Sequence, residues 1–321
     1  MDLVGIGEAM ALLRPGGPRG RLGRAASVDV AGAESNVAVG LAQLGHEVAW
    51  AGRLGDDDFG SIVAERLRRQ RVSLRLAEID PELPTGLIVK RRSPRRGVQY
   101  YRRGSAGSLI TTTLVDAVVA QKPRVVHLSG VTPALSPEAR AAVVHAVESE
   151  LAPHTITSFD VNYRPLLWST RDEAATTLRR LAGRATVVFV GLDEADALWG
   201  AHTADDVRRL LPAPRHLIVK DAAVGATEFH PEGRTHTPAF RVRIRDVVGA
   251  GDAFAAGWLH GWLTGAAPAD RVNLGHVMAG RALRSHGDFP SRAISPTSAR
   301  RRALRAARRA HTSDAPREDS R

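Results

Sequence analysis

The sequence predicts a layered α/β fold with a largely parallel sheet and two excursions from it, on the basis of two observations. Short apolar runs alternate with helix-length amphipathic segments along most of the 321 residues, a pattern typical of strands and helices that follow one another in α/β layers. Two stretches, Arg14–Val30 and Leu83–Arg103, break this alternation because they are rich in Arg, Gly and Pro yet carry strand-like residues. We therefore expect one α/β core with two excursions from it.

The apolar runs and the amphipathic segments place the core elements. Strands are expected at Leu3–Gly7, Val48–Gly52, Val125–Ser129, Thr155–Val161, Val187–Val190 and His216–Lys220. Helices are expected at Asn36–Leu44, Phe59–Arg69, Pro137–Glu148, Asp252–Leu263 and Ala269–Ser285. Gly45 ends the first of these helices, Asp56–Asp58 caps the second, and Ser136 is an N-cap followed by proline at the first helical position.

The two excursions have two interpretations. Leu87–Lys90 and Val98–Arg102 carry residues that favour strands, so the excursions can pair into a small sheet that lies across an active site. The alternative is a pair of ordinary surface loops. Near the C-terminus, the basic cluster at 300–309 is interpreted as a solvated terminal helix, with contact to an anion or nucleic acid as the alternative. Residues after about 310 lack apolar content and are expected to be disordered.

Composition excludes several classes of protein. The chain is 43% hydrophobic and 25% charged, as in ordinary globular proteins, and it contains no apolar run near the roughly 18–20 residues that a membrane span needs. The N-terminus lacks the features of an export signal, and cysteine is absent, so we expect a cytoplasmic protein without disulfides. The net charge of +11 comes almost wholly from arginines spread along the chain, and we expect neither a nucleic-acid nor a membrane partner.

Gly249-Ala250-Gly251-Asp252 is the most informative segment. Two glycines precede an alanine-rich helix, so unencumbered backbone N–H groups meet at a positive helix N-terminus and can bind a phosphoryl group. Asp252 opens this helix and can accept a proton from a hydroxyl held beside the phosphate. A glycine turn capped by an aspartate is the structural alternative. A P-loop is excluded, because the chain has no G-x-x-x-x-G-K sequence.

Two further segments give the glycine turn its context. Gly32-Ala-Glu-Ser-Asn36 continues to Gly45, and Gly52-Arg-Leu-Gly55 continues to Gly60. Together with the turn about 200 residues later, they resemble the two signature regions of the ribokinase-like (PfkB) carbohydrate kinases. The resemblance covers about residues 1–298 and implies a doubly wound α/β sandwich, with lid segments at about 14–30 and 83–103 that form a small β-lid over the sugar. Residues 299–321 would then be the basic terminal helix and tail.

Within this family, residues 100–108, 127–140 and 160–168 are similar to 2-keto-3-deoxygluconate kinases. That substrate is an acid, and Arg102 and Arg164 can hold its carboxylate through charge-assisted hydrogen bonds. Tyr100 offers a ring and a hydroxyl to the sugar chain. The full set of substrate-binding residues that the resemblance implies is Gly32, Asn36, Tyr100, Tyr101, Arg102, Arg164, Asp252 and Asp288.

The resemblance also implies a site for ATP. It comprises Asn162, Arg164, Gly191, Lys220, Gly225, Gly249, Gly251 and His276, with Mg²⁺ organised by Glu194 through water. Two positions depart from the family pattern: an amide expected shortly before Glu194 is missing, and Ala222 stands where a second glycine is expected and restricts the backbone. Asp246 either helps to hold a monovalent cation or stabilises the turn, and the turn is the favoured interpretation.

The expected reaction is transfer of the ATP γ-phosphoryl group to O6 of 2-keto-3-deoxygluconate, with Asp252 as the base and the amides of Gly249, Ala250 and Gly251 stabilising the transferred charge. A kinase for fructose, ribose or a keto-deoxy-galactonate is the alternative within the class. A catalytically weak sugar-binding regulator on the same fold is the alternative outside it. A homo-oligomer formed through the lid stays open.

Overall fold

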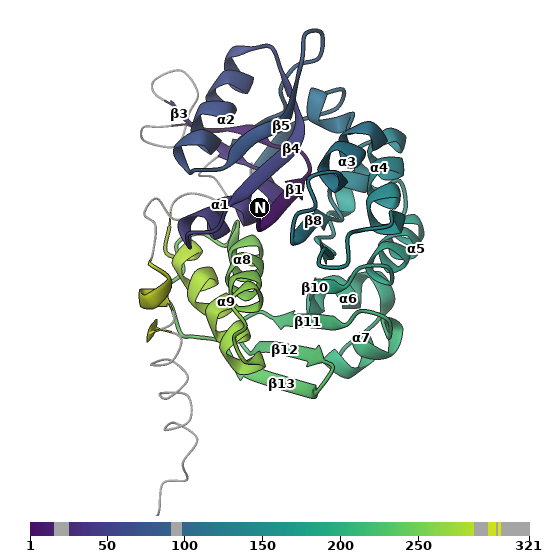
Figure 1. Ribbon diagram of the computed structural model, residues 1–321, viewed down its shortest axis with the longest axis vertical. Coiled ribbons are helices and arrows are strands. Elements are labelled where there is room, and N and C mark those ends of the chain that lie inside the picture. The colour runs from purple at the N-terminus through teal and green to yellow at the C-terminus, as the bar shows by residue number, and fades with distance from the viewer. Residues whose placement is uncertain (16–25, 91–97, 286–294, 300, 303–321) are drawn as a thin grey trace, which may run out of the picture.

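The computed structural model describes residues 1–15, 26–90, 98–285, 295–299 and 301–302. They form a nine-stranded sheet with helices on both faces, and a separate four-stranded sheet that packs at one end (Figure 1). This confirms the predicted fold class. Among the described residues no helix has the length and apolar character required to span a bilayer.

The large sheet is doubly wound. Its order is β13-β12-β11-β10-β9-β8-β1-β4-β5, with all neighbours parallel from β11 to β5 and an antiparallel hairpin, β12 and β13, at the other edge. The bounds are β1 Leu3–Ile6, β4 Val48–Gly55, β5 Ser73–Asp80, β8 Val125–Ser129, β9 Ile156–Asp160, β10 Val187–Gly191, β11 His216–Asp221, β12 Gly225–His230 and β13 Gly233–Pro238. The strand order reverses between β1 and β8, and in such sheets ligands bind beyond the carboxyl ends of the strands near this point.

Two layers of helices bury the faces of this sheet. One layer comprises α1 Ala33–Gln43, α2 Asp58–Arg69, α8 Ala250–Leu263 and α9 Pro268–Ala282, and the other comprises α3 Thr112–Val119, α4 Pro137–Glu148, α5 Arg171–Ala182, α6 Leu192–Trp199 and α7 Ala204–Leu210. Short 3₁₀ turns occupy Ala106–Ser108, Thr132–Ala134 and Pro165–Leu167. Side chains alternate between the layers, so that Phe189 packs toward α8 while Val188 and Val190 pack toward the opposite layer.

The small sheet, which we call the lid sheet, has the order β3-β2-β6-β7. Its strands are β2 Met10–Pro15, β3 Ala26–Ala31, β6 Leu87–Lys90 and β7 Val98–Tyr101. Strands from both excursions pair, because β2 runs parallel to β6, which confirms the sheet and excludes the surface-loop interpretation for the described residues. Positions 16–25 and 91–97 of the predicted lid segments lie outside the described residues.

Helix starts follow the capping residues. The Asp57 side chain accepts a hydrogen bond from the Gly60 N–H group at 2.7 Å, and Ser136 Oγ accepts one from Ala139 at 3.0 Å, so both predicted caps are confirmed. The first helix begins at Ala33 rather than Asn36, directly after Gly32, and α9 ends at Ala282 rather than Ser285. The predicted terminal helix and tail fall almost wholly outside the described residues.

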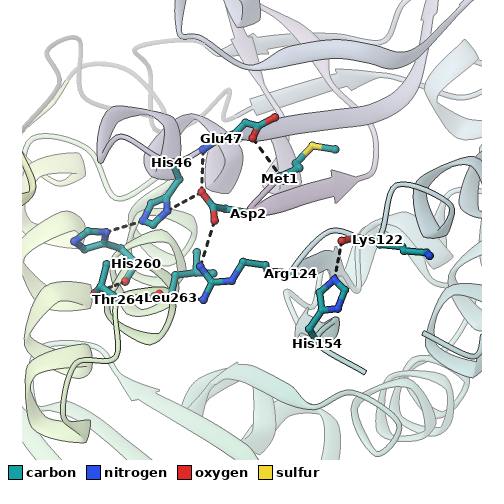
Figure 2. A network of polar contacts seen from close by, with 10 residues as sticks. All are labelled: Met1, Asp2, His46, Glu47, Lys122, Arg124, His154, His260, Leu263 and Thr264. Atoms are coloured by element: carbon teal, nitrogen blue, oxygen red, sulfur yellow. Dashed lines mark hydrogen bonds and ion pairs between the residues drawn. The ribbon is translucent and has the colours of Figure 1, made fainter. Parts of the chain in front are cut away.

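At the amino ends of the strands, a polar network holds the far end of α8 (Figure 2). Asp2 accepts hydrogen bonds from the Glu47 backbone N–H at 3.1 Å and from Arg124 at 3.3 Å, and it lies 3.2 Å from a ring nitrogen of His46. The other ring nitrogen of His46 is 2.8 Å from His260 on α8, and Arg124 also donates to the backbone oxygen of Leu263, the last residue of α8. The end of α8 is thereby fixed to the residues that precede β1, β4 and β8.

Nearer the middle of α8, a buried charged cluster connects the helix to the hairpin edge of the sheet. Glu228 on β12 is fully buried. Its carboxylate accepts hydrogen bonds from Trp258 at 2.9 Å and from Arg271 at 2.5 Å, and it lies 3.1 Å from His216. Burial alone would raise the pKa of Glu228, but the hydrogen bonds and the charge of Arg271 outweigh it, and the pKa lies below its ordinary value. The carboxylate therefore stays charged and connects β11 and β12 to α8 and α9.

We expect Glu228→Gln to lower the free energy of unfolding by about 3–5 kcal/mol, because it leaves the guanidinium group of Arg271 buried without a countercharge. Urea unfolding measures this. Asp205→Asn is the matched control, since the ion pair of Asp205 with Arg234 is exposed, and its loss should change stability by less than about 1 kcal/mol. Equal effects of the two changes would contradict the role of the buried cluster.

Candidate active site

Four ionisable side chains converge at the carboxyl edge of the large sheet. Asp160 is the last residue of β9, Lys220 lies at the end of β11, and Glu194 and Asp252 lie in the first turns of α6 and α8. Asp160 is 3% exposed. Each of the other three influences the pKa of at least one neighbour in this group, so the four side chains share one electrostatic environment.

The predicted glycine turn precedes α8 and leaves its first turn open. Gly249 has a φ angle of +75° and is the N-cap of α8, a backbone conformation that glycine adopts without steric penalty. No side chain caps the helix at this residue. A Cβ atom placed on Gly251 would lie 3.5 Å from Lys220 Nζ, so the ammonium group sits beside the turn. Helix dipole and lysine together make this position attractive to an anion.

Asp252 is the candidate base. Asn36 on α1 donates a hydrogen bond from Nδ2 to Asp252 Oδ2 at 2.8 Å, across 216 positions of sequence. The surrounding protein removes water from the carboxyl group, which raises the pKa of Asp252 to about 7, although the Asn36 hydrogen bond opposes the shift; the negative charge of Asp160 adds to it. A carboxyl group with a pKa near neutrality is suited to accept a proton at physiological pH.

Lys220 is held by Asp160. Its Nζ atom lies 2.9 Å and 3.2 Å from the two carboxylate oxygens of Asp160. Burial alone would lower the pKa of Lys220, but the charges of Asp160 and Glu194 outweigh it and the pKa lies above its ordinary value. The lysine therefore stays cationic beside the glycine turn.

Glu194 binds the backbone of two neighbouring segments at this edge. It accepts hydrogen bonds from the backbone N–H groups of Gly191 at 2.9 Å and Tyr163 at 3.1 Å. Burial raises the pKa of Glu194, while the charge of Lys220 opposes that shift. Arg164, which is 53% exposed, lies 3.6 Å from Glu194. Asn162 has a φ angle of +38°, and its buried Oδ1 atom has no hydrogen-bond partner. Gly191 and Arg164 thus lie at Glu194, and Asn162 directly precedes Tyr163, which also binds Glu194; that these residues bind ATP stays a prediction.

Among the residues predicted to bind the substrate, Arg102 is already paired. Its guanidinium group forms an ion pair with Glu8 that includes a hydrogen bond of 2.7 Å from Nε, and Ser105 Oγ donates to the same carboxylate at 2.6 Å. The side chain of Arg102 is 10% exposed and that of Glu8 is 1% exposed. A Cβ atom on Gly32 would lie 2.4 Å from the backbone oxygen of Glu8, so only glycine fits at the start of α1. Sequence reasoning did not foresee that the charge of Arg102 is neutralised.

The remaining predicted residues have different surroundings. Tyr100 and Tyr101 are 47% and 59% exposed on the edge strand β7. His276 is buried between the rings of Phe240 and Phe254 and lies 3.2 Å from the backbone oxygen of Thr237. Burial lowers the pKa of His276 to about 4, so the ring is neutral. Gly225 begins β12 at the end of the loop that contains Ala222. Asp288 lies outside the described residues.

Three carboxyl groups at this edge were missed by the sequence analysis: Glu8, Glu34 and Asp160. Glu34 on α1 is 1% exposed and accepts hydrogen bonds from Ser129 at 2.7 Å and from Thr132 at 2.8 Å. Burial raises its pKa. A signal existed for all three, because each is an acidic residue at the end of an apolar run or inside a signature segment. Among the described residues, no group of three or more His, Cys, Asp or Glu side chains can hold a metal ion by itself.

Comparison with known proteins gives this edge a context. Residues 2–293 match the pfkB family of carbohydrate kinases. The chain is 33% identical over 303 residues to a 2-dehydro-3-deoxygluconokinase of Bacillus subtilis, with 90% of this chain and 91% of the relative covered. It is 31% identical over 297 residues to a 2-dehydro-3-deoxygluconokinase of Thermoproteus tenax, with 90% of each chain covered.

A solved structure shows the same fold. It is a double mutant of a fructokinase from Vibrio cholerae, bound to fructose, ADP and a potassium ion, and it superposes with a TM-score of 0.77 at 24% identity. The match covers 96% of this chain and 98% of the fructokinase.

The loop between β11 and β12 contains a residue in a strained backbone conformation. Ala222 has a φ angle of +36°, a left-handed conformation that is unfavourable for residues with a Cβ atom. We expect Ala222→Gly to raise the free energy of unfolding by about 0.5–1 kcal/mol, as measured by urea unfolding. Ala223→Gly, at the next residue, is the control and should lower it by a similar amount. A loss of stability in both variants would show that Ala222 is unstrained.

Proposed function

Because this chain belongs to the pfkB family of carbohydrate kinases, we propose that it transfers the γ-phosphoryl group of ATP to O6 of 2-keto-3-deoxygluconate. The observation that carries the proposal is the placement of Asp252, with its raised pKa, beside the ammonium group of Lys220 at the N-terminus of α8. The two 2-dehydro-3-deoxygluconokinases described above support the choice of sugar.

In the proposed reaction, Asp252 accepts the proton of the acceptor hydroxyl as its oxygen attacks the γ-phosphorus, and the bond from phosphorus to the ADP oxygen breaks. Asn36 holds the carboxylate of Asp252 in place through the 2.8 Å hydrogen bond. The Lys220 ammonium group and the backbone amides at Gly249–Asp252 face the charge that develops on the transferred group. Asp160 acts through Lys220 and is a positioning residue.

The residues present fit a hydrated Mg²⁺ ion that accompanies ATP. The Glu194 carboxylate and the unpartnered Oδ1 atom of Asn162 are oxygen donors, and Mg²⁺ prefers oxygen ligands while keeping several waters. Glu194 and Asn162 would hold the ion through that water, and the bound ion would neutralise part of the phosphate charge.

The ion pair between Glu8 and Arg102 affects whether the site favours an acidic or a neutral sugar. Both predicted arginines have a carboxylate partner, but Arg102 is 10% exposed and hydrogen-bonded to the buried Glu8, whereas Arg164 is 53% exposed and lies 3.6 Å from Glu194, so Arg164 is the more accessible of the two to a substrate carboxylate. The proposal therefore gives Arg164 the main role in recognising the acid, while Arg102 supplies N–H donors from a fixed position. The same ion pair favours the alternative of a neutral sugar such as fructose or ribose. Such a sugar has no carboxylate, so its binding does not require the charge of Arg102 to be available.

Replacing the base tests the chemistry. Asp252→Asn should lower kcat by about 100-fold or more, because the variant cannot accept a proton. In the parent enzyme, kcat/KM should fall as the pH drops below about 7, since protonation of Asp252 removes the base. A coupled assay of ADP formation between about pH 5 and 9 measures both. The control is Asp172→Asn in the first turn of α5, where Asp172 is 90% exposed. Activity of Asp252→Asn within a few-fold of the parent would exclude Asp252 as the base.

Replacing Arg164 tests the substrate. A contact between an arginine and a substrate carboxylate is worth roughly 1.5–3 kcal/mol, or about 10- to 100-fold in kcat/KM. The parent should prefer 2-keto-3-deoxygluconate to fructose and ribose by that factor, and Arg164→Leu should remove most of the preference by lowering kcat/KM for the acid more than for the neutral sugars. Arg171→Leu, an exposed arginine nearby, is the control. Equal efficiency of the parent with fructose or ribose would replace the acid by a neutral sugar and leave the kinase function intact.

A further inference from the structure

Lys90 joins the lid sheet to the loop that leads into α8. It is the last residue of β6, and its ammonium group forms an ion pair with Asp246 across 156 positions of sequence. The two side chains are only 20% and 17% exposed. Because an ion pair shielded from water and salt interacts more strongly than an exposed one, this contact connects the position of the lid sheet with the loop ahead of Asp252.

Asp246 also shapes that loop. Its Oδ1 atom accepts a hydrogen bond from the Val248 backbone N–H group at 3.1 Å, and the backbone N–H groups of Arg245 and Asp246 donate to the Leu283 oxygen at 2.8 Å and 3.3 Å. Val248 is followed directly by Gly249, the left-handed N-cap of α8. One carboxylate thus contacts Lys90 with one oxygen and fixes the approach to the glycine turn with the other.

A carboxylate that is withdrawn from water requires a positive partner. A free monovalent cation can fill that requirement, and so can a lysine, whose ammonium group carries one positive charge and three N–H donors. Here the Oδ2 atom of Asp246 is occupied by Lys90. The charge of Lys90 would repel a second cation at the same oxygen, so the residues around Asp246 do not fit a separate monovalent ion while the lid sheet is in this position.

We propose that Lys90 is a positioning residue whose ammonium group takes the place of a monovalent cation at Asp246 when the lid sheet lies over the site. This rests on the proposed kinase function. The loop from Asp246 to Gly249 then adopts its catalytic geometry only with the lid sheet in place. Phosphoryl transfer is thereby coupled to closure, which keeps water from the γ-phosphate.

The first test removes the ammonium group. Lys90→Met should lower kcat about 10-fold, in the range of coupling energies between contacting charged groups, and added K⁺ should restore most of the loss by binding at Asp246. The parent should not respond when KCl replaces tetramethylammonium chloride at constant ionic strength. Asp246→Asn should lower kcat without any response to K⁺, because the carboxylate is gone. Lys122→Met is the matched control, because Lys122 is an exposed lysine that precedes β8 at the amino ends of the strands of the large sheet.

The second test does not need activity. In the ligand-free protein, Lys90→Met should speed backbone hydrogen exchange in residues 246–252 by several-fold relative to the parent and to Lys122→Met. If the parent phosphorylates no sugar, the kinase proposal fails while this measurement still tests the contact. The inference is overturned if Lys90→Met keeps kcat within about twofold of the parent. It is also overturned if the parent needs K⁺ as much as the variant does, or if exchange in residues 246–252 is unchanged.

Discussion

The ammonium group of Lys220 is the charge on which the carboxyl edge of the large sheet depends. Asp160 binds it directly at 2.9 Å and 3.2 Å, and the charge of Lys220 also acts on Glu194 and Asp252. Without a cation at this place, three carboxyl groups would repel one another in partly dehydrated surroundings. The parallel strands make the arrangement possible, because the ends of β9, β10 and β11 lie next to each other and deliver residues from distant parts of the chain to one edge.

The position of Asp252 depends equally on how α8 is held. The end of the helix is tied to the amino edge of the sheet through His260 and Leu263, and Trp258 is bound to the buried carboxylate of Glu228. Its N-terminus is left without a side-chain cap. The helix is therefore rigidly anchored away from the site and open at the site itself, which is the arrangement expected of a preorganised anion-binding helix.

Local sequence patterns predicted the parts of this site that depend on neighbouring residues. The glycine turn, the caps at Asp57 and Ser136, and the alternation that defines the large sheet all act over a few residues, and each was visible in the sequence. The pairings of Lys220 with Asp160 and of Arg102 with Glu8 join residues 60 and 94 positions apart. The periodicity of apolar residues in the sequence does not indicate contacts between such distant residues. Only the structure therefore shows that Glu8 neutralises the charge of Arg102. The hairpin edge β12–β13 was missed for a related reason: its strands mix polar and charged residues with few apolar ones.

The buried charges at this edge are expected to present one acceptor hydroxyl to Asp252. A crystal structure of the protein with 2-keto-3-deoxygluconate and a non-hydrolysable ATP analogue tests it most directly. O6 of the sugar should lie within about 2.6–3.2 Å of the Asp252 carboxylate, the substrate carboxylate should contact Arg164, and the γ-phosphate should lie between the glycine turn and Lys220. A closed complex in which no sugar hydroxyl reaches Asp252 would contradict it.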